Sequence, residues 1–193
     1  MSSSDDVRPG ATHVPVLNVA NALTVLRIVM VPVFLAALFA AGGHDTAWRW
    51  IAFAVFAVAM LTDRVDGQIA RRYGMITEFG KLMDPIADKA LTGAALIGLS
   101  VLGDLWWWVT VVILVREIGI TLMRVVVIAE GVIPASRGGK LKTLLQGIAI
   151  GLYVMPLPAI CDWPRSVVMG AALVITVLTG VDYVLSLRRG ERA

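Results

Sequence analysis

The chain has 193 residues, of which 58% are hydrophobic, and it carries a formal net charge of +3. One cysteine and two histidines exclude an intramolecular disulfide framework, a cysteine-based metal site and a histidine-rich zinc site. A hydrophobic share above the roughly one half found in soluble domains indicates a single compact domain that sits in a membrane.

The first residues, MSSSDDVRPGATHVP, are polar and lack the basic-then-apolar form of a cleavable signal peptide. We expect residues 1–16 to form a disordered tail. Residues 17–189 are expected to form one membrane domain, because no linker, repeat or low-complexity segment divides them. Lipid is therefore the expected surrounding, and nothing in the sequence indicates a nucleic-acid partner.

Apolar stretches follow in chain order near residues 24–41, 48–72, 85–102, 105–129, 142–160 and 165–187. Their lengths match the about 17–25 residues that a membrane-spanning helix needs. Pro32 falls inside the first stretch and Pro156 and Pro158 inside the fifth, where we expect kinks that membrane helices tolerate. The pattern predicts an all-α integral membrane protein with six transmembrane helices.

Basic residues are unevenly distributed among the predicted loops. They flank the first and last stretches and the second and fourth turns, whereas the opposite loops hold only Arg49 and Arg165. By the positive-inside rule, both termini then face the cytoplasm. We expect a multi-pass protein of the cytoplasmic (inner) membrane, with a polar cavity that opens to the cytoplasm.

Four aspartates interrupt this apolar chain between residues 63 and 88: Asp63, Asp66, Asp84 and Asp88. A charge at mid-bilayer costs roughly 2.5–3.5 kcal/mol on insertion scales, so intramembrane acids are usually functional. Helical spacing places the first two on one face of the second helix and the last two on one face of the third. The intervening turn is short, so the four carboxylates can point into one space at the cytoplasmic boundary.

Close carboxylates repel one another unless a cation lies between them, and an all-oxygen site suits Mg²⁺, Mn²⁺ or Ca²⁺. Gly67, Ala70 and Gly80 lie on the same faces and leave room for a ligand, while Arg71 supplies a phosphate-binding cation. The alternative is that the aspartates only mark helix ends and water-facing turns. Their number and spacing favour metal-dependent phosphate chemistry.

The segment DRVDGQIARRYGMITEFGKLMDPIAD, residues 63–88, reads D-x2-D-G-x2-A-R-x8-G-x3-D-x3-D. This resembles the signature of the CDP-alcohol phosphotransferase family. The resemblance implies a six-helix membrane enzyme, typically a homodimer, that transfers the phosphatidyl or a similar group of a CDP-linked donor to an alcohol and releases CMP. It also implies Mg²⁺ or Mn²⁺ bound by Asp63, Asp66 and Asp84, with Asp88 as the base and a further ligand.

The same resemblance assigns the CDP moiety of the donor to Gly67 and Arg71, beside Ala70 and Gly80. Thr77 falls at a donor-contacting position of some relatives, although a threonine in a turn is often only a cap. The family would also place Asn21, Thr24 and Arg27 over the cytidine. The alternative for this helix is a cap-and-anchor arrangement with a snorkelling arginine. We expect donor contact.

Segments 18–38, 115–124, 131–146 and 182–183 are similar to family members that join CDP-diacylglycerol to sn-glycerol 3-phosphate. A phosphorylated acceptor needs a cationic pocket, and four residues of the fourth helix and of the entry to the fifth can form it: Arg116, Arg124, Lys140 and Lys142. The alternative is that Arg116 pairs with an acidic neighbour and the lysines only set topology.

Two kinds of rival remain at this point. Family members that use inositol phosphate or phosphatidylglycerol as acceptor share the aspartate signature. A small cation transporter would also carry intramembrane acids, but a transport path should continue across the membrane, and all four aspartates lie near one face.

Overall fold

The computed structural model describes the backbone of residues 19–73, 78–129 and 138–188, and the side chains of residues 22–62, 86–87, 89–123 and 141–187. These residues form six α-helices and no strand. The helices are α1 (Val19–Phe39), α2 (Thr46–Tyr73), α3 (Glu78–Val101), α4 (Trp107–Ala129), α5 (Gly138–Val154) and α6 (Asp162–Arg188). Two short 3₁₀ helices, η1 (Ala40–Gly43) and η2 (Ala159–Cys161), lie in connections. The predicted all-α class is confirmed.

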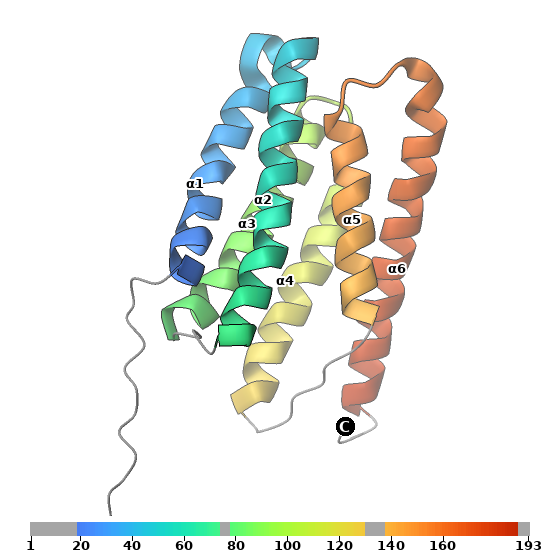
Figure 1. The fold of residues 1–193 in the computed structure, drawn as a ribbon. Helices are drawn as coiled ribbons and strands as arrows, with labels where there is room; N and C mark the ends of the chain where they lie inside the picture. The colour runs from blue at the N-terminus through green and yellow to red at the C-terminus, as the bar shows by residue number, and fades with distance from the viewer. Residues whose placement is uncertain (1–18, 74–77, 130–137, 189–193) are drawn as a thin grey trace, which may run out of the picture.

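The helices form an up-and-down bundle (Figure 1). We call the end where α1 begins and α6 ends the proximal end; α2 ends and α3 begins there too. The opposite, distal end carries η1, the α3–α4 turn and η2. Both segments that hold the aspartate signature therefore approach the proximal end.

Among the described residues, two helical stretches, Ala22–Gly43 and Ala159–Leu187, are long and apolar enough to cross a membrane, and 28% of the apolar window in each is buried. Thr46–Thr62, Lys89–Val101 and Leu141–Val154 are shorter apolar helical segments. Large apolar side chains such as Leu122 and Trp163 are exposed on the outside of the bundle. A surface this apolar fits a lipid environment better than water.

The core combines large and small side chains. Phe34 of α1 and Phe56 of α2 are buried with ring centroids 5.8 Å apart. A Cβ atom added to Gly98 of α3 would lie 2.7 Å from Leu38 of α1, so the glycine allows these two helices to approach closely. Small residues at helix contacts are a common way for membrane helices to pack.

The fifth helix ends earlier than the apolar stretch predicts. It stops at Val154 rather than near residue 160, so Pro156 and Pro158 lie after the helix and do not kink it. The physical reason is that proline has no backbone N–H and its ring clashes with the preceding turn. Pro32, by contrast, lies inside α1, which continues to Phe39.

At the distal end, Arg49 of α2 connects several elements. Its Nε donates to the Gly43 carbonyl at 2.6 Å, its Nη1 donates to the Tyr153 carbonyl at 3.2 Å, and its Nη2 forms an ion pair with Asp104. Arg165 of α6 lies over the Tyr153 ring, 4.9 Å from the centroid. This distal network joins η1, the α3–α4 turn, the end of α5 and the start of α6.

Candidate functional site

The four signature aspartates fall on helical backbone. Asp63 and Asp66 lie in the last part of α2, and Asp84 and Asp88 lie in the first half of α3. Their side chains lie outside the described residues, so the convergence of the carboxylates stays a prediction. Because the backbone is helical at these positions, the three- and four-residue spacings keep each pair on one helix face.

The residues predicted to bind the donor's CDP moiety also lie on α2 and α3 or in the connection between them. Gly67, Ala70 and Arg71 belong to α2 and Gly80 belongs to α3, with no described side chains. Thr77 lies outside the described residues altogether. For the acceptor, Arg124 of α4 and Lys140 of α5 have no described side chains.

On α1, Thr24 and Arg27 are each 1% exposed, and the side chain of Asn21 lies outside the described residues. A snorkelling arginine would extend to the membrane surface, whereas Arg27 is enclosed by protein. Its burial supports a role inside the bundle.

A charged cluster joins three helices around Glu117 of α4. Lys142 of α5 forms an ion pair with Oε1 of Glu117, and Lys89 of α3 places its Nζ 3.4 Å from Oε2. Arg116 Nη1 lies 3.3 Å from Oε1. Among the described side chains, three cations thus surround one carboxylate, so this cluster carries more positive than negative charge.

Arg116 is also anchored to α6. Its Nε donates to the Thr176 carbonyl at 2.9 Å, and its Nη2 donates to Thr179 Oγ1 at 2.8 Å. A Cβ atom on Gly180 would lie 3.1 Å from the Arg116 side chain, so α6 approaches the guanidinium closely. Arg116 therefore pairs with an acidic neighbour, as its alternative interpretation predicts.

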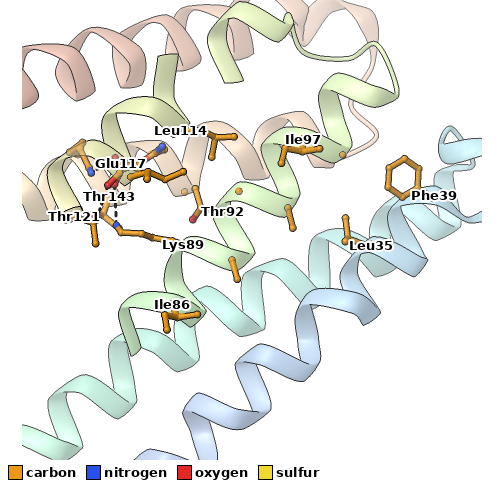
Figure 2. A pocket seen from close by; sticks show the side chains of 18 residues that line it. Leu35, Phe39, Ile86, Lys89, Thr92, Ile97, Leu114, Glu117, Thr121 and Thr143 are labelled. Atoms are coloured by element: carbon orange, nitrogen blue, oxygen red, sulfur yellow. Dashed lines mark hydrogen bonds and ion pairs between the residues drawn. The ribbon is translucent and has the colours of Figure 1, made fainter. Parts of the chain in front are cut away.

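Next to this cluster is a cavity of about 770 Å³ between α1, α3, α4 and α5. Figure 2 shows Lys89, Glu117, Thr121 and Thr143 gathered at one end, and Leu35, Phe39 and Ile97 towards the other. Lys142 and Gln146 also line it. The charged groups gather at one end of the cavity, whereas apolar side chains line both ends, so the cavity can hold a largely apolar molecule with a charged end.

Sequence reasoning picked out Lys142 but did not include the other polar residues of this cavity among the site residues, notably Lys89, Glu117 and Gln146. The sequence could have indicated Glu117 and Lys89 as site residues, because each is a charged residue inside a predicted membrane-spanning helix. The sequence could not have indicated Gln146, because a single neutral amide in an apolar helix forms no spacing pattern with other polar residues.

The model of the CDP-alcohol phosphatidyltransferase family matches residues 17–179. The chain belongs to this family. The resemblance seen in the signature is therefore confirmed, and the protein is a transferase of a membrane-bound family rather than a cation transporter.

Individual relatives agree with the family match. A Mycobacterium tuberculosis (strain CDC 1551 / Oshkosh) protein named "Probable phosphatidylglycerophosphate synthase" is 63% identical over 169 residues, covering 88% of this chain and 81% of the relative. A Bacillus subtilis (strain 168) protein named "CDP-diacylglycerol--glycerol-3-phosphate 3-phosphatidyltransferase" is 34% identical over 179 residues, covering 86% of this chain and 93% of the relative. A Salmonella paratyphi A protein with the same name as the Bacillus one is 29% identical over 181 residues.

Proposed function

We propose that the protein is a phosphatidylglycerophosphate synthase, which transfers the phosphatidyl group of CDP-diacylglycerol to sn-glycerol 3-phosphate and releases CMP. The observation that carries this proposal is Lys89. It follows Asp88 directly on α3 and lines the cavity together with Lys142. Thr92, one turn after Asp88 on the same face of α3, lines this cavity as well, so the face of α3 that carries Asp84 and Asp88 leads towards a cavity with two lysines, as transfer of a phosphatidyl group to a phosphorylated acceptor requires.

The carboxylates of Asp63, Asp66, Asp84 and Asp88 are the residues that would hold Mg²⁺ or Mn²⁺. Their donor set fits, because hard divalent cations prefer carboxylate oxygens and the helical backbone of α2 and α3 keeps each pair on one face. Bound metal supplies positive charge that stabilises the diphosphate as CMP leaves.

Asp88 accepts the proton of the attacking hydroxyl. The hydroxyl oxygen of glycerol 3-phosphate forms a bond to the phosphorus that carries diacylglycerol, and the bond from that phosphorus to the CMP oxygen breaks. The proton passes to the Asp88 carboxylate, so atoms and charge balance in this step.

The donor's CDP moiety is assigned to the face of α2 and α3 around Arg71, with Thr77 in the connection between them. Gly67, Ala70 and Gly80 lack bulky side chains, which leaves space for the diphosphate beside the backbone. On α1, buried Thr24 and Arg27, with Asn21 one turn earlier, are assigned to the cytidine end.

The acceptor's phosphate is assigned to Lys142 and Lys89, the two ammonium groups that line the cavity. Arg116 forms an ion pair with Glu117. Arg124 and Lys140 lie further towards the proximal end, where their positive charge attracts the anion to the cavity. A phosphate monoester carries about −1.5 to −2 charge at pH 7. The excess positive charge around Glu117 complements it.

The proposal includes six membrane-spanning helices, with the proximal end in the cytoplasm of a bacterial inner membrane. Arg49 and Arg165 belong to the distal end, in agreement with the positive-inside rule. Homodimer formation is proposed from the family resemblance alone.

The function is tested with purified protein in detergent, CDP-diacylglycerol and Mg²⁺, by following CMP release with glycerol 3-phosphate, inositol phosphate or phosphatidylglycerol. We expect release with glycerol 3-phosphate only, and its loss when a chelator removes the metal. Release with another acceptor would keep the transfer chemistry and refute the acceptor assignment. Inactivity with all three would refute the proposed function.

The assignment of the acceptor phosphate predicts a selective defect in Lys142→Met. Loss of a charge-assisted hydrogen bond, worth about 1.5–3 kcal/mol, should raise KM for glycerol 3-phosphate by about 10- to 100-fold. KM for CDP-diacylglycerol should stay within about twofold of wild type, because Lys142 contacts the acceptor and not the donor in this assignment.

The matched variant is Lys142→Arg, which keeps a positive charge beside Glu117 and should retain most of the affinity. A parallel rise of KM for both substrates in Lys142→Met would indicate general damage to the bundle and count against a phosphate-binding role.

A further inference from the structure

Glu117 of α4 holds two lysines that come from different helices. Its Oε1 accepts a hydrogen bond from Lys142 Nζ of α5, and its Oε2 lies 3.4 Å from Lys89 Nζ of α3. Within the described part of the chain, every ion pair of these two lysines is made with Glu117. The carboxylate therefore determines where the two ammonium groups lie relative to each other.

The carboxylate of Glu117 is itself fixed in place. Arg116 Nη1 lies 3.3 Å from its Oε1, and the same guanidinium donates two hydrogen bonds to α6, at the Thr176 carbonyl and at Thr179 Oγ1. The side chain of Glu117 is 12% exposed. These contacts restrict its rotation, so it can support longer and more flexible side chains.

Lys89 is the side chain that gains most from this support. It lines the cavity and is 30% exposed, whereas the side chain of Lys142 is 7% exposed. A flexible lysine loses rotamer freedom when a ligand fixes it, and a lysine that is already held loses less. An ammonium group has three hydrogens, so each lysine can donate one to Glu117 and keep two for a bound phosphate.

The negative charge of Glu117 does not itself help to bind an anion. A carboxylate beside a phosphate site repels the phosphate, so removing that charge should not weaken phosphate binding. The contribution that remains is geometric. The phosphate anchors one end of the acceptor, and an error of about 1 Å in the position of a reacting group can cost about 10²-fold in rate.

We propose that Glu117 is a positioning residue, which holds Lys89 and Lys142 so that the phosphate of the acceptor is bound in one place. This role deepens the proposed function and rests on it. Thr92, one turn after Asp88 on the same face of α3, lines the same cavity as the two lysines. A phosphate held at one fixed place in this cavity keeps the acceptor's hydroxyl in reach of Asp88.

The test compares kcat with phosphate affinity in Glu117→Gln, which removes the charge and keeps the length of the side chain. With glycerol 3-phosphate, kcat should fall about 10- to 100-fold, because the lysines are no longer held at a fixed spacing. The inhibition constant of inorganic phosphate, measured in competition with glycerol 3-phosphate, should fall or stay within about twofold of wild type. The control is Asp45→Asn, which removes a carboxylate at the distal end and should change neither value.

A double-mutant cycle tests whether Glu117 acts through Lys89. Lys89→Met alone should slow the reaction. In the variant that combines Lys89→Met with Glu117→Gln, the loss of kcat should be at least about threefold smaller than the product of the two single losses, because residues that act together are not additive. A smaller deviation from the product would show that Glu117 acts independently of Lys89 and would overturn the proposal.

Unchanged kcat in Glu117→Gln would also overturn the proposal, as would a parallel loss of kcat and phosphate affinity, which indicates general damage to the bundle. If Glu117→Gln does not fold, Glu117→Asp replaces it. This variant keeps the charge, but its shorter side chain cannot hold lysines of both α3 and α5, so kcat should again fall with phosphate affinity kept. A wild-type protein that releases no CMP with glycerol 3-phosphate would refute the proposed function itself. An active wild-type protein with an equally active Glu117→Gln or Glu117→Asp variant would refute the positioning role alone.

Discussion

Asp88→Asn is expected to remove nearly all transferase activity. The amide cannot accept the proton of the attacking hydroxyl, and loss of a positioned general base alone lowers rates by about 10²- to 10⁴-fold. Weaker metal binding should add to this loss. The measurement is CMP release from CDP-diacylglycerol and glycerol 3-phosphate at saturating Mg²⁺.

A matched control is Asp45→Asn at the distal end. Asp45 Oδ1 accepts a hydrogen bond from the Trp48 N–H, and asparagine caps a helix about as well as aspartate. This variant should keep wild-type activity. If Asp88→Asn also kept activity within tenfold of wild type, the assignment of Asp88 as the base would be wrong.

A variant of a predicted metal ligand separates the two functions of the acidic cluster. Asp63→Asn should raise the Mg²⁺ concentration needed for half-maximal rate, since one anionic ligand is lost. Asp88→Asn should remain slow at any Mg²⁺ concentration, because added metal does not replace a proton acceptor.

Asp104→Asn is expected to cause the largest loss of stability. Arg49 has a 6% exposed side chain, and Asp104 is its anionic partner. Removing one partner of a buried ion pair leaves an uncompensated charge and typically costs about 3–5 kcal/mol. The unfolding temperature in detergent, measured at one fixed scan rate, should fall by several degrees on the usual scale for a domain of this size.

The proposed active site lies at the opposite end of the bundle, so the folded Asp104→Asn protein should retain its kcat at low temperature. Asp45→Asn again serves as the control and should unfold like wild type. A combined Arg49→Met, Asp104→Leu variant should recover part of the loss, because apolar replacement of a buried pair is often tolerated. Equal unfolding temperatures for Asp104→Asn and Asp45→Asn would show that the ion pair contributes nothing.

The helices and the enzyme family could be predicted from the sequence because their signals are local. Apolar stretches of spanning length mark the helices, and the aspartate signature lies within one short segment. Even here the end of α5 was misplaced, because apolar residues continue past Val154 although Pro156 and Pro158 cannot continue the helix.

The parts that could not be predicted depend on contacts between distant segments. Glu117 meets Lys89 and Lys142 across three helices, and Arg116 binds α6 through Thr176 and Thr179. No pattern within one helix shows which neighbour packs against it. That Gln146 Nε2 has no hydrogen-bond partner among the described residues becomes visible only when the surrounding helices are in place.

The distal network also constrains how the chain can be assembled during synthesis. Arg49 is made early, but its anionic partner follows 55 residues later and the Tyr153 carbonyl 104 residues later. Until α3 and the turn after it have been made, the guanidinium of Arg49 has the Gly43 carbonyl as a partner but lacks the Asp104 carboxylate. The distal part of α2 therefore reaches its final position late, after the segments that carry Asp104 and Tyr153 have been synthesised and packed against it. Ribosome-bound chains that end before Asp104 should leave Arg49 open to aqueous labelling, and longer chains should protect it.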